Sequence, residues 1–166
     1  SLAITWSFFH KMYEKNSDLS TNFLVVSPNI IVLERLLTDL GKDKKVFSSD
    51  PIIPENGYEN KNWKKDFKLN VHIQDDINPH ERENNLFITN VHRIYQSRKS
   101  LDDEFLNYLS GETKNPTISD SKLLESLENL DSLVILNDEA HHIGLSETEW
   151  HRSIEHLHLN LVQKQS

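Results

Sequence analysis

Residues 133–142 read Leu-Val-Ile-Leu-Asn-Asp-Glu-Ala-His-His. The apolar run 133–136 predicts a short strand that is buried on both faces, as in a parallel sheet covered by helices. Two carboxylates, Asp138 and Glu139, follow where this strand would end. In open α/β sheets, ligands bind outside the carboxyl ends of the strands. A carboxylate there can hold Mg²⁺ against nucleotide phosphates, the Walker B role, and a second one can orient or deprotonate an attacking water.

The rest of the chain alternates predicted strands with predicted helices. Strands are predicted at 23–26, 69–73, 86–88 and 133–136, with a further candidate at 46–47. Helices are predicted at 2–14, 27–41, 100–110, 122–129 and 146–161. Segment 42–80 is less regular and resembles an insertion, with a loop at 51–65. This order predicts a single α/β domain over residues 1–166, with a parallel sheet covered by helices on both faces.

Two of these helices carry wide apolar arcs. In helix 2–14 the arc is so wide that it predicts a largely buried helix; its members are Leu2, Ile4, Trp6, Phe8, Phe9, Met12 and Tyr13. The second helix begins at the N-cap Ser27 with Pro28 in its first turn and ends at Gly41. Its predicted packing residues are Ile30, Ile31, Leu33, Leu36, Leu37 and Leu40.

The composition fits a globular domain. The 166 residues are 36% hydrophobic and 27% charged, with a net charge of -8 and no cysteine. No apolar run reaches the ~20 residues of a membrane span, and no basic segment marks a leader peptide, so we expect a cytoplasmic protein. The net charge argues mildly against nucleic acid. Lys61, Lys64, Lys65 and Lys68 could contact a phosphate backbone, although a solvated face is the better interpretation of such a charge run.

Three motifs carry a resemblance to a known family. Asp138-Glu139-Ala140-His141 resembles motif II of DEAH-box superfamily 2 helicases and translocases, and the longer string 133–142 is similar to the motor subunit of type III restriction enzymes. Residues 25–36, Val-Val-Ser-Pro-Asn-Ile-Ile-Val-Leu-Glu-Arg-Leu, resemble motif Ia of the same family. Residues 87–92, Phe-Ile-Thr-Asn-Val-His, resemble a further motif before motif II. The three motifs occur in the family's order and span most of the chain.

The resemblance implies part of the first RecA-like domain of a P-loop NTPase motor, which uses ATP and Mg²⁺ to move on double-stranded DNA. It assigns the metal to Asp138, through water, and the positioning of the attacking water to Glu139. It implies that His141 links the nucleotide to neighbouring motor elements, and that Ser1 is the last residue of the phosphate loop, with its hydroxyl on Mg²⁺. The nucleic-acid contacts that it implies are Ser27, Pro28, Asn29, Thr89, Asn90 and His92. The implied partners are double-stranded DNA and a DNA-methyltransferase specificity subunit, with no membrane.

The chain departs from the family pattern in one respect. It contains no G-x-x-x-x-G-K-[ST] loop, and its Gly41-Lys42 pair follows a helix and lacks the earlier glycine. We therefore expect a piece of a larger motor, cut between the end of this loop and motif III, that hydrolyses ATP barely or not at all by itself.

Two alternatives stay open at this stage. One is a non-catalytic α/β nucleic-acid-binding or interaction module that has lost the ATPase chemistry. The other is a metal hydrolase built on clustered histidines, whose spacing suits one helical face poorly; these are His141, His142, His151, His156 and His158.

Overall fold

The computed structural model describes residues 1–27, 30–40, 47, 52–53, 61, 63–73, 82–90, 93–94, 118–137, 155 and 159, with backbone only for 118–122. The helices are α1 (Leu2–Tyr13), α2 (Ile30–Leu40), α4 (Trp63–Asp66) and α6 (Ile118–Glu128). The strands are β1 (Phe23–Ser27), β2 (Asn70–Ile73), β3 (Asn85–Asn90) and β4 (Val134–Asn137). Of the other predicted elements, helix 100–110 lies outside these residues, and of the predicted helix 146–161 only residues 155 and 159 are described, both of them helical.

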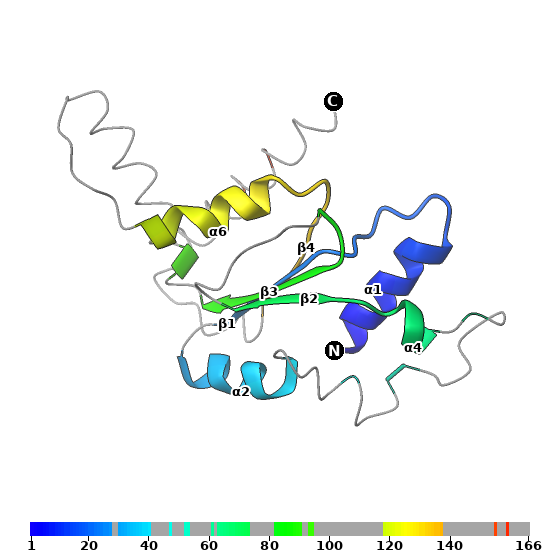
Figure 1. Cartoon of the computed structure of the whole chain (residues 1–166), viewed down its shortest axis with the longest axis horizontal. Coiled ribbons are helices and arrows are strands. Elements are labelled where there is room, and N and C mark those ends of the chain that lie inside the picture. The colour runs from blue at the N-terminus through cyan, green and yellow to red at the C-terminus, as the bar shows by residue number, and fades with distance from the viewer. Residues whose placement is uncertain are drawn as a thin grey trace.

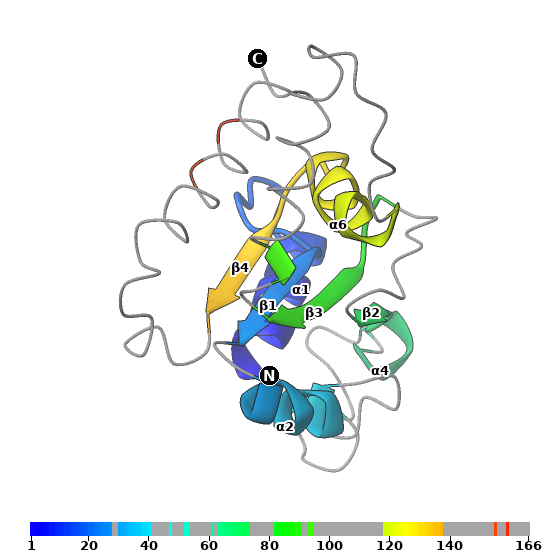
Figure 2. The same ribbon diagram turned by 90° about the vertical axis from the view of Figure 1, so that its left-hand side faces the viewer.

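The four strands form one parallel sheet in the order β2-β3-β1-β4 (Figure 2). Every residue of β1 and of β3 is buried, as expected for strands covered on both faces. The four predicted strands at 23–26, 69–73, 86–88 and 133–136 are thereby confirmed to within two residues at each end. The α/β architecture with a parallel sheet is confirmed as well.

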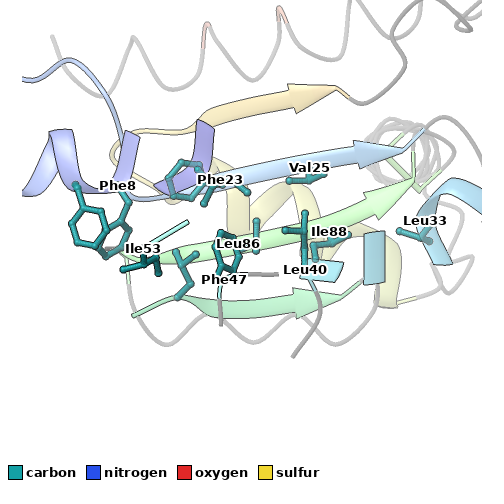
Figure 3. Packing of buried hydrophobic residues seen from close by; sticks show 12 residues of the cluster. Phe8, Phe23, Val25, Leu33, Leu40, Phe47, Ile53, Leu86 and Ile88 are labelled. Atoms are coloured by element: carbon teal, nitrogen blue, oxygen red, sulfur yellow. The ribbon is translucent and has the colours of Figure 1, made fainter. Parts of the chain in front are cut away.

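Helices cover both faces of the sheet (Figure 1). Side chains of one face, including Phe23, Val25 and Ile88, pack with residues from α1 and α2. Figure 3 shows Phe8 beside Phe23 at the start of β1, and Leu33 of α2 near the other end of the sheet. On the opposite face, residues such as Leu24 and Phe87 pack against Leu123, Leu124 and Leu127 of α6. Alternate residues of each strand thus supply two separate apolar layers.

The apolar arcs of α1 and α2 were predicted to be buried more widely than they are. In α1, Leu2 is 70% exposed, Trp6 61% and Met12 45%. In α2, Ile30 is 62% exposed and Ile31 79%. The physical reason is that each helix lies on one sheet face and turns only one arc of its surface towards it.

Three boundaries also differ from the prediction. α6 begins at Ile118 rather than at 122, the end of the predicted loop 51–65 belongs to α4, and Phe47 is helical rather than in a strand. Among the described residues, no helix is both long enough and apolar enough to cross a membrane.

The described part of segment 42–80 is packed into the core. Trp63 stacks on Phe9 with ring centroids 4.1 Å apart, and the Tyr13 hydroxyl donates to Asp66 Oδ2 at 3.0 Å. Lys61 Nζ lies 3.8 Å from the centroid of the Tyr13 ring, which is a cation–π contact. Lys61 is therefore in contact with α1, and all four lysines of this stretch, Lys61, Lys64, Lys65 and Lys68, are exposed.

A chain of polar side chains runs along the amino ends of β3, β1 and β4 and reaches β2 at its third residue, and we call it the asparagine network: His72, Asn85, Asn22, Ser132 and Ser20. Asn22 Oδ1 accepts from both the backbone N–H and the side-chain amide of Asn85, at 3.1 and 3.0 Å. Asn22 Nδ2 donates to the carbonyl oxygens of Arg82 and Ser132. These four hydrogen bonds tie the start of β1 to the segments that enter β3 and β4.

The network extends to both outer strands. Asn85 Oδ1 lies 3.0 Å from His72 Nε2, and because the Asn85 amide nitrogen donates elsewhere, this oxygen accepts from a protonated Nε2. At the other end, Ser20 Oγ donates to the Ser132 carbonyl, and the Ser132 hydroxyl donates to Ser20 Oγ. The starts of β1, β3 and β4 are therefore fixed relative to one another, and β2 is held to the start of β3 through His72.

We predict that Asn22→Ala destabilises the fold by about 2–4 kcal/mol, because it leaves several buried polar groups of the network without a partner. Denaturant unfolding measures this value. Asn16→Ala, which removes the same group from an exposed position, should change stability by less than about 0.5 kcal/mol. Equal effects of the two substitutions would contradict the role of the network.

A second prediction concerns pH. Burial, with help from Asp66, raises the pKa of Tyr13 to about 12. The folded state thus holds this proton more tightly than the unfolded chain, whose pKa is 10.0. The resulting stability is complete below pH 10 and is lost as the pH rises through about 12. Phenolate absorbance should show one tyrosine titrating near 12 that is missing in Tyr13→Phe. An unchanged titration in Asp66→Asn would exclude Asp66 as a cause.

Candidate nucleotide and nucleic-acid site at the carboxyl edge

β3, β1 and β4 end side by side at one edge of the sheet (Figure 2). The register pairs Ser27 of β1 with Asn90 of β3, and Val26 with both Thr89 and Asn137. β4 ends at Asn137, the residue before Asp138 in the sequence. The strands that carry or precede the three motifs are therefore neighbours, and their carboxyl ends are aligned, which is where open α/β sheets hold their ligands.

The structure describes four of the predicted site residues. Ser27, Thr89 and Asn90 lie together at this edge. Ser1 precedes α1, is exposed, and accepts a backbone hydrogen bond from Thr5 N–H through its carbonyl. The remaining predicted site residues lie outside the described part of the chain: Pro28, Asn29, His92, Asp138, Glu139 and His141. Their predicted roles, and that of Ser1 towards Mg²⁺, stay predictions.

The three predicted nucleic-acid contacts that the structure describes are buried. Ser27 is 0% exposed, Thr89 1% and Asn90 7%. The Ser27 hydroxyl donates to the Thr89 carbonyl at 3.4 Å, which is a long hydrogen bond between β1 and β3. These side chains lie inside the ends of β1 and β3, and their predicted contact with nucleic acid stays a prediction.

Asn90 has a defined local task. Its Oδ1 accepts from the backbone N–H of Arg93 at 3.0 Å, and residues 93–94 are helical. A side-chain oxygen that accepts from the N–H three residues later is the geometry of a helix N-cap. Asn90 thus shapes the exit from β3, a task that the sequence motif alone did not indicate.

Among the described residues, no group of three or more histidine, cysteine, aspartate or glutamate side chains comes together to hold a metal ion. The histidines proposed for a metal hydrolase, from His141 to His158, lie outside the described residues. That alternative stays a prediction.

One polar residue at this edge was given no role from the sequence. Asn137 ends β4, and its Oδ1 is buried without a hydrogen-bond partner. Thr89 Oγ1 shares this property. The signal in the sequence was a polar residue that ends an apolar strand, which is common and therefore not specific.

Comparison with protein families gave one match. The family described as "Type III restriction enzyme, res subunit" matches residues 1–163 of the chain. No curated protein and no solved structure matches the chain.

We predict that Asn90→Ala lowers the stability of the fold by about 1 kcal/mol, the usual cost of losing an N-cap side chain. Asn90→Asp keeps the accepting oxygen and should retain most of that stability. Denaturant unfolding of the two variants beside the wild type measures both effects. Equal losses in the two variants would show that the hydrogen bond to Arg93 is not the source of the stabilisation.

Proposed function

The chain belongs to the family of the type III restriction enzyme res subunit, and we propose that it is the part of the motor domain that couples ATP hydrolysis to movement along double-stranded DNA. Its RecA-like α/β fold and its place among superfamily 2 helicase-type NTPase motor domains follow from the family match and the parallel sheet. The coupling to DNA and the restriction context go beyond this and are our proposal.

One observation carries the proposal: the strands before the three motifs lie side by side in the order β3-β1-β4, with their carboxyl ends aligned. The motif II residues Asp138 and Glu139 follow β4, and the motif Ia residues follow β1. One edge of the sheet thus serves both the nucleotide and the nucleic acid.

The chemistry of the acidic pair suits a magnesium nucleotide. Carboxylate oxygens are the hard ligands that Mg²⁺ accepts, and one or two of them, with phosphates and waters, commonly complete its shell. We assign Asp138 to the metal, through water, and Glu139 to the orientation of the attacking water. When it is bound, Mg²⁺ neutralises charge on the phosphates.

The nucleic acid is assigned to the turns that follow β1 and β3. Pro28 and Asn29 follow β1, and His92 follows β3. Buried Ser27, Thr89 and Asn90 would hold these turns in place rather than touch the backbone directly. Double-stranded DNA is the proposed track, and a DNA-methyltransferase specificity subunit is the proposed protein partner.

The second candidate function is a non-catalytic nucleic-acid-binding or interaction module. It is favoured by one observation, the absence of a G-x-x-x-x-G-K-[ST] loop from these 166 residues. Such a loop cradles the phosphates, and its lysine reaches them. For this reason we expect the 166 residues alone to be inactive, and the test requires the complete gene product.

We predict that the complete gene product hydrolyses ATP in a Mg²⁺-dependent reaction that duplex DNA stimulates, and that Glu139→Gln lowers the rate by about 100-fold or more, the usual contribution of a residue that handles the proton of the attacking water. Steady-state phosphate release measures this. Glu125→Gln, at an exposed position of α6, is the matched control and should leave the rate unchanged.

Two results would contradict the motor. Complete absence of hydrolysis in the wild-type gene product, together with DNA binding, would establish the non-catalytic module instead. Full activity in Glu139→Gln would remove that residue from the reaction.

A further inference from the structure

Three residues form a row across the carboxyl ends of three adjacent strands: Thr89 of β3, Val26 of β1 and Asn137 of β4. The register pairs Val26 with Thr89 on one side and with Asn137 on the other. Val26 belongs to the apolar layer beneath α6, and paired residues of neighbouring parallel strands face the same side. Thr89 and Asn137 therefore face the α6 side, on either side of Val26.

This row is polar where the fold alone would favour apolar residues. The preceding row on the same face is Phe87, Leu24 and Ile135, all of them apolar. Thr89 is only 1% exposed, yet within the described part of the chain its hydroxyl has no hydrogen-bond partner, and neither does the buried Oδ1 of Asn137. Each buried polar atom without a partner costs about 1–3 kcal/mol. A valine and a leucine would fill the same volumes without that cost.

The two polar atoms cannot satisfy each other directly. Neighbouring strands lie about 4.8 Å apart, so the backbones of Thr89 and Asn137 are about 10 Å apart with Val26 between them. Each atom needs a partner beyond the row. The residues that follow are Asn90 after Thr89, Ser27 after Val26 and Asp138 after Asn137. Every member of the row thus directly precedes a residue of a proposed functional turn.

We propose that Thr89 and Asn137 are positioning residues that couple nucleic-acid binding at the end of β3 to hydrolysis at the end of β4. Their polar atoms form their hydrogen bonds when nucleic acid and nucleotide are both bound. The proposal rests on the proposed function and deepens it. In the free protein these unsatisfied oxygens lower the stability of the fold. The chain retains them because they form hydrogen bonds in the bound state.

The test uses the complete gene product and the near-isosteric variants Thr89→Val, Asn137→Leu and the double variant. ATP hydrolysis is measured without nucleic acid and at a saturating concentration of a blunt DNA duplex. The ratio of the two rates should fall about fivefold or more in each single variant, the lower end of the usual coupling between sites. The double variant should lose no more than the larger single loss, because both residues serve one link. Thr38→Val, at an exposed hydroxyl of α2, is the matched control.

Thermal unfolding supplies a readout that does not depend on catalysis. Because Thr89→Val removes an unpartnered buried hydroxyl, its melting temperature should equal or exceed that of the wild type. Reduced stimulation in a protein of undiminished stability supports a positioning role, since a merely structural residue would leave the stimulation ratio unchanged.

The results that would contradict the inference can be told apart from those that would contradict the proposed motor. Unchanged stimulation in both single variants, or losses that multiply in the double variant, overturns the coupling while leaving the motor intact. A weaker Kd for the duplex in Thr89→Val alone, with stimulation restored at saturation, makes Thr89 a direct contact and overturns it as well. A wild type that hydrolyses no ATP overturns the proposed function, and the inference with it.

Discussion

The pair of hydrogen bonds between Asn22 and Asn85 is the constraint on which the rest of the sheet depends. Parallel strands are not joined by tight hairpins, so no short turn fixes their register. The asparagine network does this at the amino ends, where Asn22 also holds the carbonyl oxygens of Arg82 and Ser132. The backbone contributes through the N–H of Val134, which donates to the Asn22 carbonyl at 2.9 Å. A fixed start for each strand determines where its carboxyl end lies, and the candidate site is built from those ends.

The two edges of the sheet treat buried polar groups in opposite ways. At the amino edge, Asn22 uses both its amide oxygen and its amide nitrogen in hydrogen bonds, and such groups add stability and specify one register. At the carboxyl edge, Thr89 and Asn137 each bury an oxygen without a partner. The carboxyl edge thus holds two of the four unsatisfied buried side-chain atoms of the described residues, the other two being Thr5 Oγ1 in α1 and Trp63 Nε1 in α4. Natural proteins usually depart from locally consistent structure at functional sites.

The sequence predicted those features that depend on local pattern. Apolar patterns located all four strands and α2, because these signals act within a few residues. Ser27, which was predicted to be the N-cap of α2, is instead the last residue of β1. The direction in which a helix turns its apolar arc depends on the sheet, so the exposure of Trp6 and Ile31 was not predictable. Motif resemblance located Ser27, Thr89 and Asn90, but their burial depends on layers supplied by distant segments. The asparagine network was missed for the same reason, since its members come from four separate parts of the chain.

The position of β1 gives it a mechanical role that no single motif indicates. Within the described sheet, β1 lies between β3 and β4, and β4 pairs only with β1. In the proposed motor, a displacement at the end of β3 would therefore reach the end of β4 through β1, whose every residue is buried. A stiff central strand such as β1 transmits a displacement only if side chains in both neighbouring strands, β3 and β4, change their contacts in response to it. Val26 has an apolar side chain and cannot supply a directional bond, so that response falls to the polar residues beside it, Thr89 and Asn137.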